Sequence, residues 1–122
     1  MPILKVAVGL FGFSVIASAS ITLKTDIELA GGIKASPVVT VNEATPATIT
    51  QDQITLKIIA TSESKKDAAK IVAEVSKRTG NEDHFVGKAT LIALWGEPAE
   101  VSVKEDDGTL RYRIKVTPSK KP

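Results

Sequence analysis

Apolar and charged residues alternate without interruption from Leu110 to Val116. The apolar set is Leu110, Tyr112, Ile114 and Val116, and the basic set is Arg111, Arg113 and Lys115. A period of two residues is typical of a β-strand with one buried face. We therefore expect the apolar set in a core and the basic set in solvent.

The residues before this strand predict further strands. Asp106-Asp107-Gly108 is a tight-turn sequence because glycine adopts positive φ at no steric cost. The alternating segment around Val101 and Val103 is therefore expected to pair with the last strand. Gly96-Glu97-Pro98 predicts a corner, and Ala89–Trp95 predicts a third strand. Residues 88–118 thus form a unit of strand, corner, strand, turn and strand.

A similar order occurs between residues 21 and 61. Its expected strands are Ile21–Leu29, Ile33–Val41, Ala47–Thr50 and Ile54–Ala60. Because Pro37 lacks an amide hydrogen, the second of these strands is expected at a sheet edge or a bulge.

The two regions can be aligned as an internal duplication. The matching segments are Lys34-Ala35 with Lys88-Ala89, Pro46-Ala47 with Pro98-Ala99, and Ile54–Ile58 with Leu110–Ile114. We interpret 21–61 and 70–118 as repeats. The alternative is that any two meanders with proline corners look alike, because strands use few residue types.

Residues 61–80 admit two interpretations. Capping serines, basic residues near the end and Gly80 favour a short helix near 64–78. The duplication instead favours a strand at Lys70–Ser76 with Ile71, Ala73 and Val75 inward. We prefer the strand, followed by a long hairpin loop at Lys77–His84.

These elements predict a single all-β domain over residues 20–122. Short strands with polar turns at regular spacing indicate an antiparallel sandwich or open barrel of about seven to nine strands. Two duplicated β-meander units would build it, with at most one short helix near 64–78.

The first residues have the pattern of a secretory signal peptide. Lys5 supplies the positive start, Val6–Ile16 is an apolar run, and Ala17-Ser18-Ala19 offers small residues for cleavage. The run is shorter than the roughly 20 apolar residues that span a bilayer. We expect removal of 1–19 near Ala19, a periplasmic or secreted bacterial protein, and no membrane span in the mature chain. The alternatives are a buried first element or an uncleaved anchor.

Composition excludes several classes of chemistry. The net charge is only +2, so nothing in the overall charge attracts nucleic acid. Cysteine is absent, which rules out disulfides, thiolate catalysis and iron–sulfur ligation. The one histidine, His84, follows Glu82 and Asp83, but a zinc site needs three or four protein ligands. We expect a solvated loop there, with no metal and no cofactor.

No catalytic group is expected either. Two groups of acidic residues occur at turns: Glu97 and Glu100 flank a proline corner, and Glu105, Asp106 and Asp107 cluster at the turn before the last strand. Acid–base catalysis needs two carboxyl groups whose surroundings give them different pKa values, and carboxyl groups in water have no such difference. The remaining candidate for binding is the basic face formed by Arg111, Arg113 and Lys115. It either binds an acidic partner or is a solvated face or guarded edge. Trp95 is either a core anchor or part of a binding platform.

One element resembles a known family. Trp95–Val101, followed after a turn by Ile114–Pro118, is similar to a strand–corner–strand element of bacterial outer-membrane secretins and of small periplasmic proteins that lack the pore. Pro46–Ile49 is a degraded copy. The resemblance covers about a quarter of the chain well and uses common turn and strand residues. It implies an extracytoplasmic β-module, without a pore and without assigned functional residues.

The expected function is therefore that of an exported, non-enzymatic β-module of the bacterial cell envelope that contacts a protein partner. We expect the contact at an open strand edge beside Leu110–Val116, through β-augmentation. Homo-oligomers are compatible with this mode. The alternative is a pilus-like or filament-like structural subunit that assembles by strand donation, with residues 20–29 as donor.

Overall fold

The computed structural model describes residues 20–63 and 67–120. No helix occurs in these ranges, and consequently none that could cross a membrane. The predicted signal segment, 1–19, lies outside the described residues and stays a prediction. The strands are β1 Ser20–Leu29, β2 Ile33–Ala35, β3 Val38–Asn42, β4 Ala47–Gln51, β5 Ile54–Glu63, β6 Ala68–Thr79, β7 Glu82–Leu94, β8 Ala99–Lys104 and β9 Leu110–Lys120.

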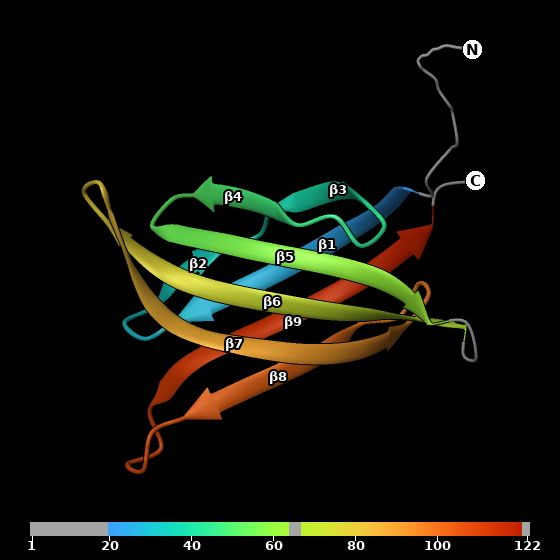
Figure 1. Ribbon diagram of the computed structural model, residues 1–122. Helices are drawn as coiled ribbons and strands as arrows, with labels where there is room; N and C mark the ends of the chain where they lie inside the picture. The colour runs from blue at the N-terminus through green and yellow to red at the C-terminus, as the bar shows by residue number, and fades with distance from the viewer. Residues whose placement is uncertain (1–19, 64–66, 121–122) are drawn as a thin grey trace.

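The strands form two antiparallel sheets that pack face to face (Figure 1). Sheet A has the order β2-β1-β9-β8, with β3 also paired to β1 beyond the end of β2. Sheet B has the order β4-β5-β6-β7. In Figure 1 sheet B lies in front and the β1–β9 pair runs diagonally behind it. The predicted all-β antiparallel sandwich is confirmed, and the sheets do not close into a barrel.

The core lies between the sheets and consists almost entirely of aliphatic side chains. Alternate residues of the central strands are fully buried, among them Leu23 of β1, Leu56 of β5 and Ile114 of β9. Three members of the apolar face predicted from Leu110 to Val116 are buried, namely Tyr112, Ile114 and Val116, whereas Leu110 at the start of the strand is only partly buried. Alternation of buried and exposed positions therefore sets the register of each strand.

Most of the contested stretch, residues 68–79, is a strand. β6 runs from Ala68 to Thr79, with Ile71, Ala73 and Val75 fully buried as predicted. β-Branched residues pack well on a pleated sheet, and tertiary pairing with β5 and β7 overrides the helical end signals.

The long loop predicted at Lys77–His84 is wrong. β6 continues to Thr79 and β7 begins at Glu82, so only two residues form the turn. Gly80 has φ 62°, which lets so short a connection reverse the chain. The residues that follow, Phe85–Lys88, also belong to β7.

Pro37 lies at a sheet edge, as predicted. It interrupts the expected strand 33–41 and divides it into β2 and β3. Its carbonyl oxygen accepts hydrogen bonds from the Thr25 amide (3.1 Å) and the Thr25 hydroxyl (2.6 Å). Thr25 is buried, so these bonds satisfy a polar side chain within the apolar core.

The strand order has an internal two-fold relation. Exchanging β1 with β6, β3 with β7, β4 with β8 and β5 with β9 converts the order β3-β1-β9-β8 into that of sheet B. The register also agrees at one charged pair, in which β2 continues the edge formed by β3. Glu28 lies opposite Lys34 in sheet A, and Glu74 lies opposite Lys88 in sheet B. Duplication would produce this arrangement, and it stays a prediction about the origin of the chain.

A close contact joins the sheets near one end of the sandwich. Gly87 of β7 lies against the ring of Tyr112 on β9, and an added Cβ would lie 2.7 Å from Cζ. The register of β7 against β6 shifts between Val75 and Ser76, which leaves Val86 without a partner opposite it. Such a bulge bends the strand and increases its twist. The bulge and the missing side chain together let β7 approach Tyr112.

Candidate functional site

A sandwich of two open sheets has four strand edges, and three of them are protected. The β2–β3 edge consists of strands of three and five residues separated by Pro37. β4 has five residues and begins directly after Pro46. β8 has six residues and exposes Glu100 and Lys104. Short length, proline and charge are the usual means by which proteins block edge-to-edge pairing.

The fourth edge, along β7, lacks this protection in its second half. β7 has 13 residues, and among residues 20–63 and 67–120 its one strand partner is β6. Its first half carries the charges of Glu82 and Asp83 and ends in the bulge at Val86. The segment Lys88–Leu94 is regular and bears no charge after Lys88. We call this segment the β7 edge.

The direction of the backbone groups follows from one hydrogen bond. The Trp95 amide donates to the Asp67 carbonyl oxygen at 3.3 Å, so residue 95 faces β6. Backbone groups of an antiparallel strand alternate between its two sides. The amides and carbonyls that face outward are therefore those of Lys88, Thr90, Ile92 and Leu94.

The same residues carry the exposed side chains of the edge. Ile92 and Leu94 are each 51% exposed, which is high for large aliphatic residues on a sheet. Opposite Thr90 on β6 is the half-buried Val72, and beyond it on β5 is Ile59. Ile59 and Val72 form an apolar strip on the outer face of sheet B that ends at Thr90, and Ile92 lies beside it at the open edge, opposite Lys70 of β6. Exposed apolar side chains gathered in this way mark interaction surfaces.

The predicted basic face lies on sheet A, away from this edge. Arg111, Arg113 and Lys115 point outward from β9 as expected. The guanidinium of Arg111 forms an ion pair with Glu105 (2.9 Å), and that of Arg113 contacts both Glu28 and Glu100. Two of the three basic groups are therefore neutralised within the chain, and Lys115 is exposed between Asp26 and Glu100 of the neighbouring strands.

The strand edge expected beside Leu110–Val116 is not open. β9 lies inside sheet A, paired with β1 on one side and with β8 on the other. The pattern of a strand shows which face is buried, but an inner strand and an edge strand with one solvated face have the same alternation. For this reason the guarded-edge interpretation of the basic residues is also wrong. Their side chains lie on the outer face of sheet A, and binding of an acidic partner there stays a prediction.

Trp95 lies at the corner after β7 and packs, partly buried, against the core. The Lys120 ammonium nitrogen is 4.8 Å from the centre of its ring, a cation–π geometry. The next residue, Gly96, donates its amide to the Pro118 carbonyl oxygen at 2.7 Å. Trp95 therefore lies near the end of β9, whereas Arg111 lies near its start, and the structure does not bring them together.

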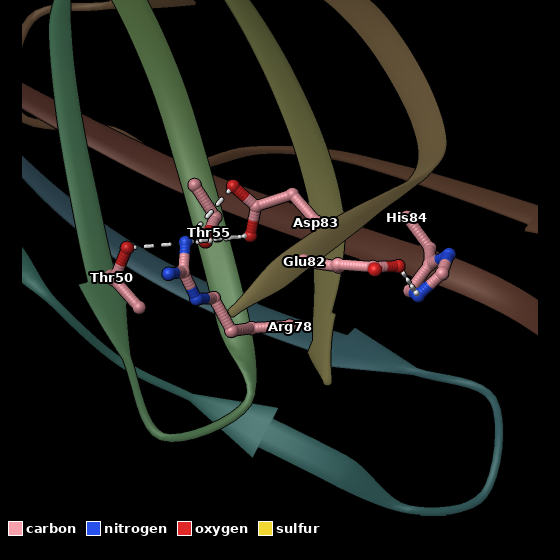
Figure 2. A network of polar contacts seen from close by, with 6 residues as sticks. All are labelled: Thr50, Thr55, Arg78, Glu82, Asp83 and His84. Carbon is pink, nitrogen blue, oxygen red and sulfur yellow. Dashed lines mark hydrogen bonds and ion pairs between the residues drawn. The ribbon is translucent and has the colours of Figure 1, made fainter. Parts of the chain in front are cut away.

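A polar network covers the start of β7 (Figure 2). The Thr55 hydroxyl donates to Asp83 Oδ1 at 2.8 Å, and Arg78 forms an ion pair with the same carboxylate at 3.2 Å. These contacts hold the pKa of Asp83 below its ordinary value, the Thr55 hydrogen bond having the largest effect. Figure 2 shows Glu82 and His84 on the other side of the strand, 3.8 Å apart. Asp83 therefore cannot bind the same metal ion as Glu82 and His84. The described residues contain no cluster of side chains suited to a metal ion.

We expect the Asp83 network to stabilise the fold in a pH-dependent way. Because the pKa of Asp83 is lower in the folded chain than in the unfolded chain, its contribution is present at neutral pH and is lost as pH falls through the folded pKa. The Asp83→Asn variant should therefore melt below wild type at pH 7. The difference in melting temperature should shrink when the pH is below 3.8, the ordinary pKa of an aspartate side chain. Melting temperatures of both proteins across this range check it, with Glu82→Gln as the control; a gap that persists unchanged in acid contradicts it.

A hollow of about 470 Å³ lies at the end of the sandwich, lined by Leu29, Ala30, Lys77, Phe85, Val86 and Arg111. Phe85 is 65% exposed. The guanidinium of Arg111 is already bound by Glu105 through two hydrogen bonds. One lysine beside an apolar wall does not define a class of ligand, so the hollow is a weaker candidate than the β7 edge.

Sequence reasoning missed the β7 edge. The uncharged run Ala89–Leu94 was the available signal, because a strand without charge or proline is either central or unguarded. No family model, no curated protein and no solved structure matches this chain.

Proposed function

We propose that this protein is an exported, non-enzymatic binding module of the bacterial cell envelope that acts through protein–protein contact. Its binding surface is the β7 edge, where an extended segment of a partner adds to sheet B by β-augmentation. The observation that carries the proposal is the contrast between this edge and the three protected ones. Natural proteins guard exposed edges, so a long unguarded edge indicates a surface that is covered in use.

Placement in the envelope rests on the predicted signal segment and on the resemblance to secretin-associated β-modules. If it holds, the chain expressed in a Gram-negative host should be recovered from the periplasm beginning at Ser20. Intact mass spectrometry of the periplasmic fraction measures this directly. A chain retained in the cytoplasm with residues 1–19 attached would remove export from the proposal and leave the binding surface in place.

Strand donation by residues 20–29 is not favoured by any contact in the structure. β1 pairs with β9 over nine residue positions and also with β2 and β3. Donating this segment to another copy would require breaking those ladders and exposing fully buried residues such as Ile21 and Leu23.

The binding surface can be tested with a synthetic strand. The probe is a peptide with the sequence of Lys88–Leu94, extended by a lysine at each end for solubility. We expect it to bind the full chain and to protect the amides of Thr90 and Ile92 from hydrogen exchange, because these amides face the open edge. Nuclear magnetic resonance titration measures both effects.

Two matched proline variants locate the binding. Thr90 and Thr48 are both exposed threonines on edge strands of sheet B, and the amide of each points away from the sheet. Proline at position 90 removes an edge donor without breaking the pairing with β6. Thr90→Pro should weaken peptide binding by at least about tenfold, equivalent to 1.4 kcal/mol, and Thr48→Pro should not. Equal binding by both variants, or no binding by wild type at concentrations at which it is monomeric, would overturn the proposed surface.

A further inference from the structure

We propose that the partner at the β7 edge is a second copy of this chain. The inference rests on the proposed function, since it identifies the segment that the edge receives. Two β7 strands would pair antiparallel across a two-fold axis, and sheet B would continue into sheet B of the second copy. The assembly is a closed homodimer built from one self-complementary surface.

One register satisfies the outward backbone groups of all four residues. With Leu91 of both copies on the two-fold axis, Thr90 lies opposite Ile92 of the second copy, and Lys88 lies opposite Leu94. Each of these positions presents its amide and carbonyl to the edge, as derived from the Trp95–Asp67 hydrogen bond. Opposed residues of this kind exchange two hydrogen bonds. The bulge at Val86 ends the pairing on one side and the Gly96 corner ends it on the other.

Charge favours a second copy. When a strand pairs with itself about a two-fold axis, each charge approaches its own equivalent, and like charges directly opposite one another are destabilising. Here Ala89–Leu94 carries no charge. Lys88, the one charged member of the β7 edge, lies opposite Leu94 and remains beside Glu74 of its own β6. The segment is therefore self-complementary, and an acidic or basic partner strand would gain no charge pairing at its centre.

The exposed side chains support the same occupant. In this register Ile92 of each copy lies beside Thr90 of the other, and Val72 of that copy follows on the next strand, so the two strips lie in adjacent rows of one enlarged sheet. Ile92 and Leu94 lose the exposure that is unusual in the isolated chain.

The other edges explain why assembly would stop at two copies. The enlarged sheet ends in β4 on both sides, which is short and preceded by Pro46. Sheet A ends in the broken β2–β3 edge and in the charged β8 edge. β3 and β4 carry no charge, but each has only five residues and lies beside a proline, so none of these edges offers a long uncharged strand to a third copy. We therefore expect a dimer and no filament.

Sedimentation velocity of the full chain from micromolar to millimolar concentration tests the dimer. Wild type and Thr48→Pro should reach the dimer mass. Thr90→Pro and Ile92→Lys should stay monomeric, the first through loss of an edge amide and the second through a charge beside the apolar strip. A monomeric wild type overturns the inference, and so does a dimer that persists in both edge variants.

The register can be tested separately because the chain contains no cysteine. Opposed Cα atoms that exchange hydrogen bonds are about 5.5 Å apart, within the range of a disulfide. A mixture of Thr90→Cys and Ile92→Cys chains should oxidise mainly to the mixed dimer. Equal yields of the two same-variant dimers would contradict the register.

The two proposals fail in different ways. If wild type is monomeric but binds the Lys88–Leu94 peptide with protection of Thr90, the edge binds strands and the second copy is not the partner. If neither the dimer nor the peptide complex forms, the proposed function itself falls.

Discussion

Replacement of Gly87 by alanine is expected to destabilise the fold by about 1–3 kcal/mol, the range typical of overpacking in a well-packed interior. The new Cβ would lie 2.7 Å from Cζ of Tyr112 and closer still to Cε1. Tyr112 cannot easily move away, because it is buried between its β-strand neighbours and the opposite sheet. Urea denaturation measured by circular dichroism gives the change in unfolding free energy.

Two variants separate the ring contact from other effects. The Thr90→Ala variant introduces an alanine into β7, as Gly87→Ala does, but on the exposed face of the strand. This substitution should change the unfolding free energy little. In a Tyr112→Val background the cost of Gly87→Ala should largely disappear, because the clashing ring is gone. A cost that is equal in both backgrounds would show that Gly87 is required for the bulge and not for the approach to Tyr112.

Truncation of Ile114 to alanine is expected to cost about 2–5 kcal/mol. Ile114 is fully buried in β9, opposite Ile27 on one side and Val101 on the other. Loss of its branched side chain removes apolar burial and leaves a cavity at the centre of sheet A. A domain of this size is stable by only about 5–15 kcal/mol, so the variant should approach the limit of folding at 37 °C.

The adjacent residue provides the control. Lys115 is exposed on the other face of the same strand, and Lys115→Ala should lie within about 0.5 kcal/mol of wild type. Equilibrium denaturation of the pair measures how fully the alternation along β9 divides core from surface. Similar losses for both variants would contradict the assignment of the two faces.

The sequence was sufficient for the faces of the strands because side-chain alternation is a local property. Lys70–Ser76 has the buried face that its apolar residues predict, and so has β9 from Tyr112 to Val116, although Leu110 is only partly buried. The sequence was misleading for the length of the hairpin after Lys77, where charged and glycine residues resemble a loop. There, cross-strand contacts such as Arg78 with Asp83 extend the ladder to the turn.

The candidate site could not be predicted because it depends on strand order. Whether a strand lies inside a sheet or at its edge is decided by partners distant in sequence. β9 pairs with β1, about ninety residues earlier, and so cannot offer the edge expected beside it. In the part of the chain that the structure describes, β7 has no strand partner beyond β6, although its uncharged run would suit a central strand.

The same strand order implies a sequence of events during folding. Sheet B is a meander of consecutive strands, so each of its pairings closes only a short loop. In sheet A the first strand, β1, pairs with the last strand, β9, so that this pairing closes nearly the whole described chain. Distant pairings form slowly because closing a long loop costs more entropy. Because the chain is synthesised from its amino terminus, the strands of sheet B are complete before β9 is made. Sheet B is therefore expected to assemble first. The strand edge available to a second copy would then exist before the sandwich is closed, and two nascent chains held close together could pair before either has finished folding.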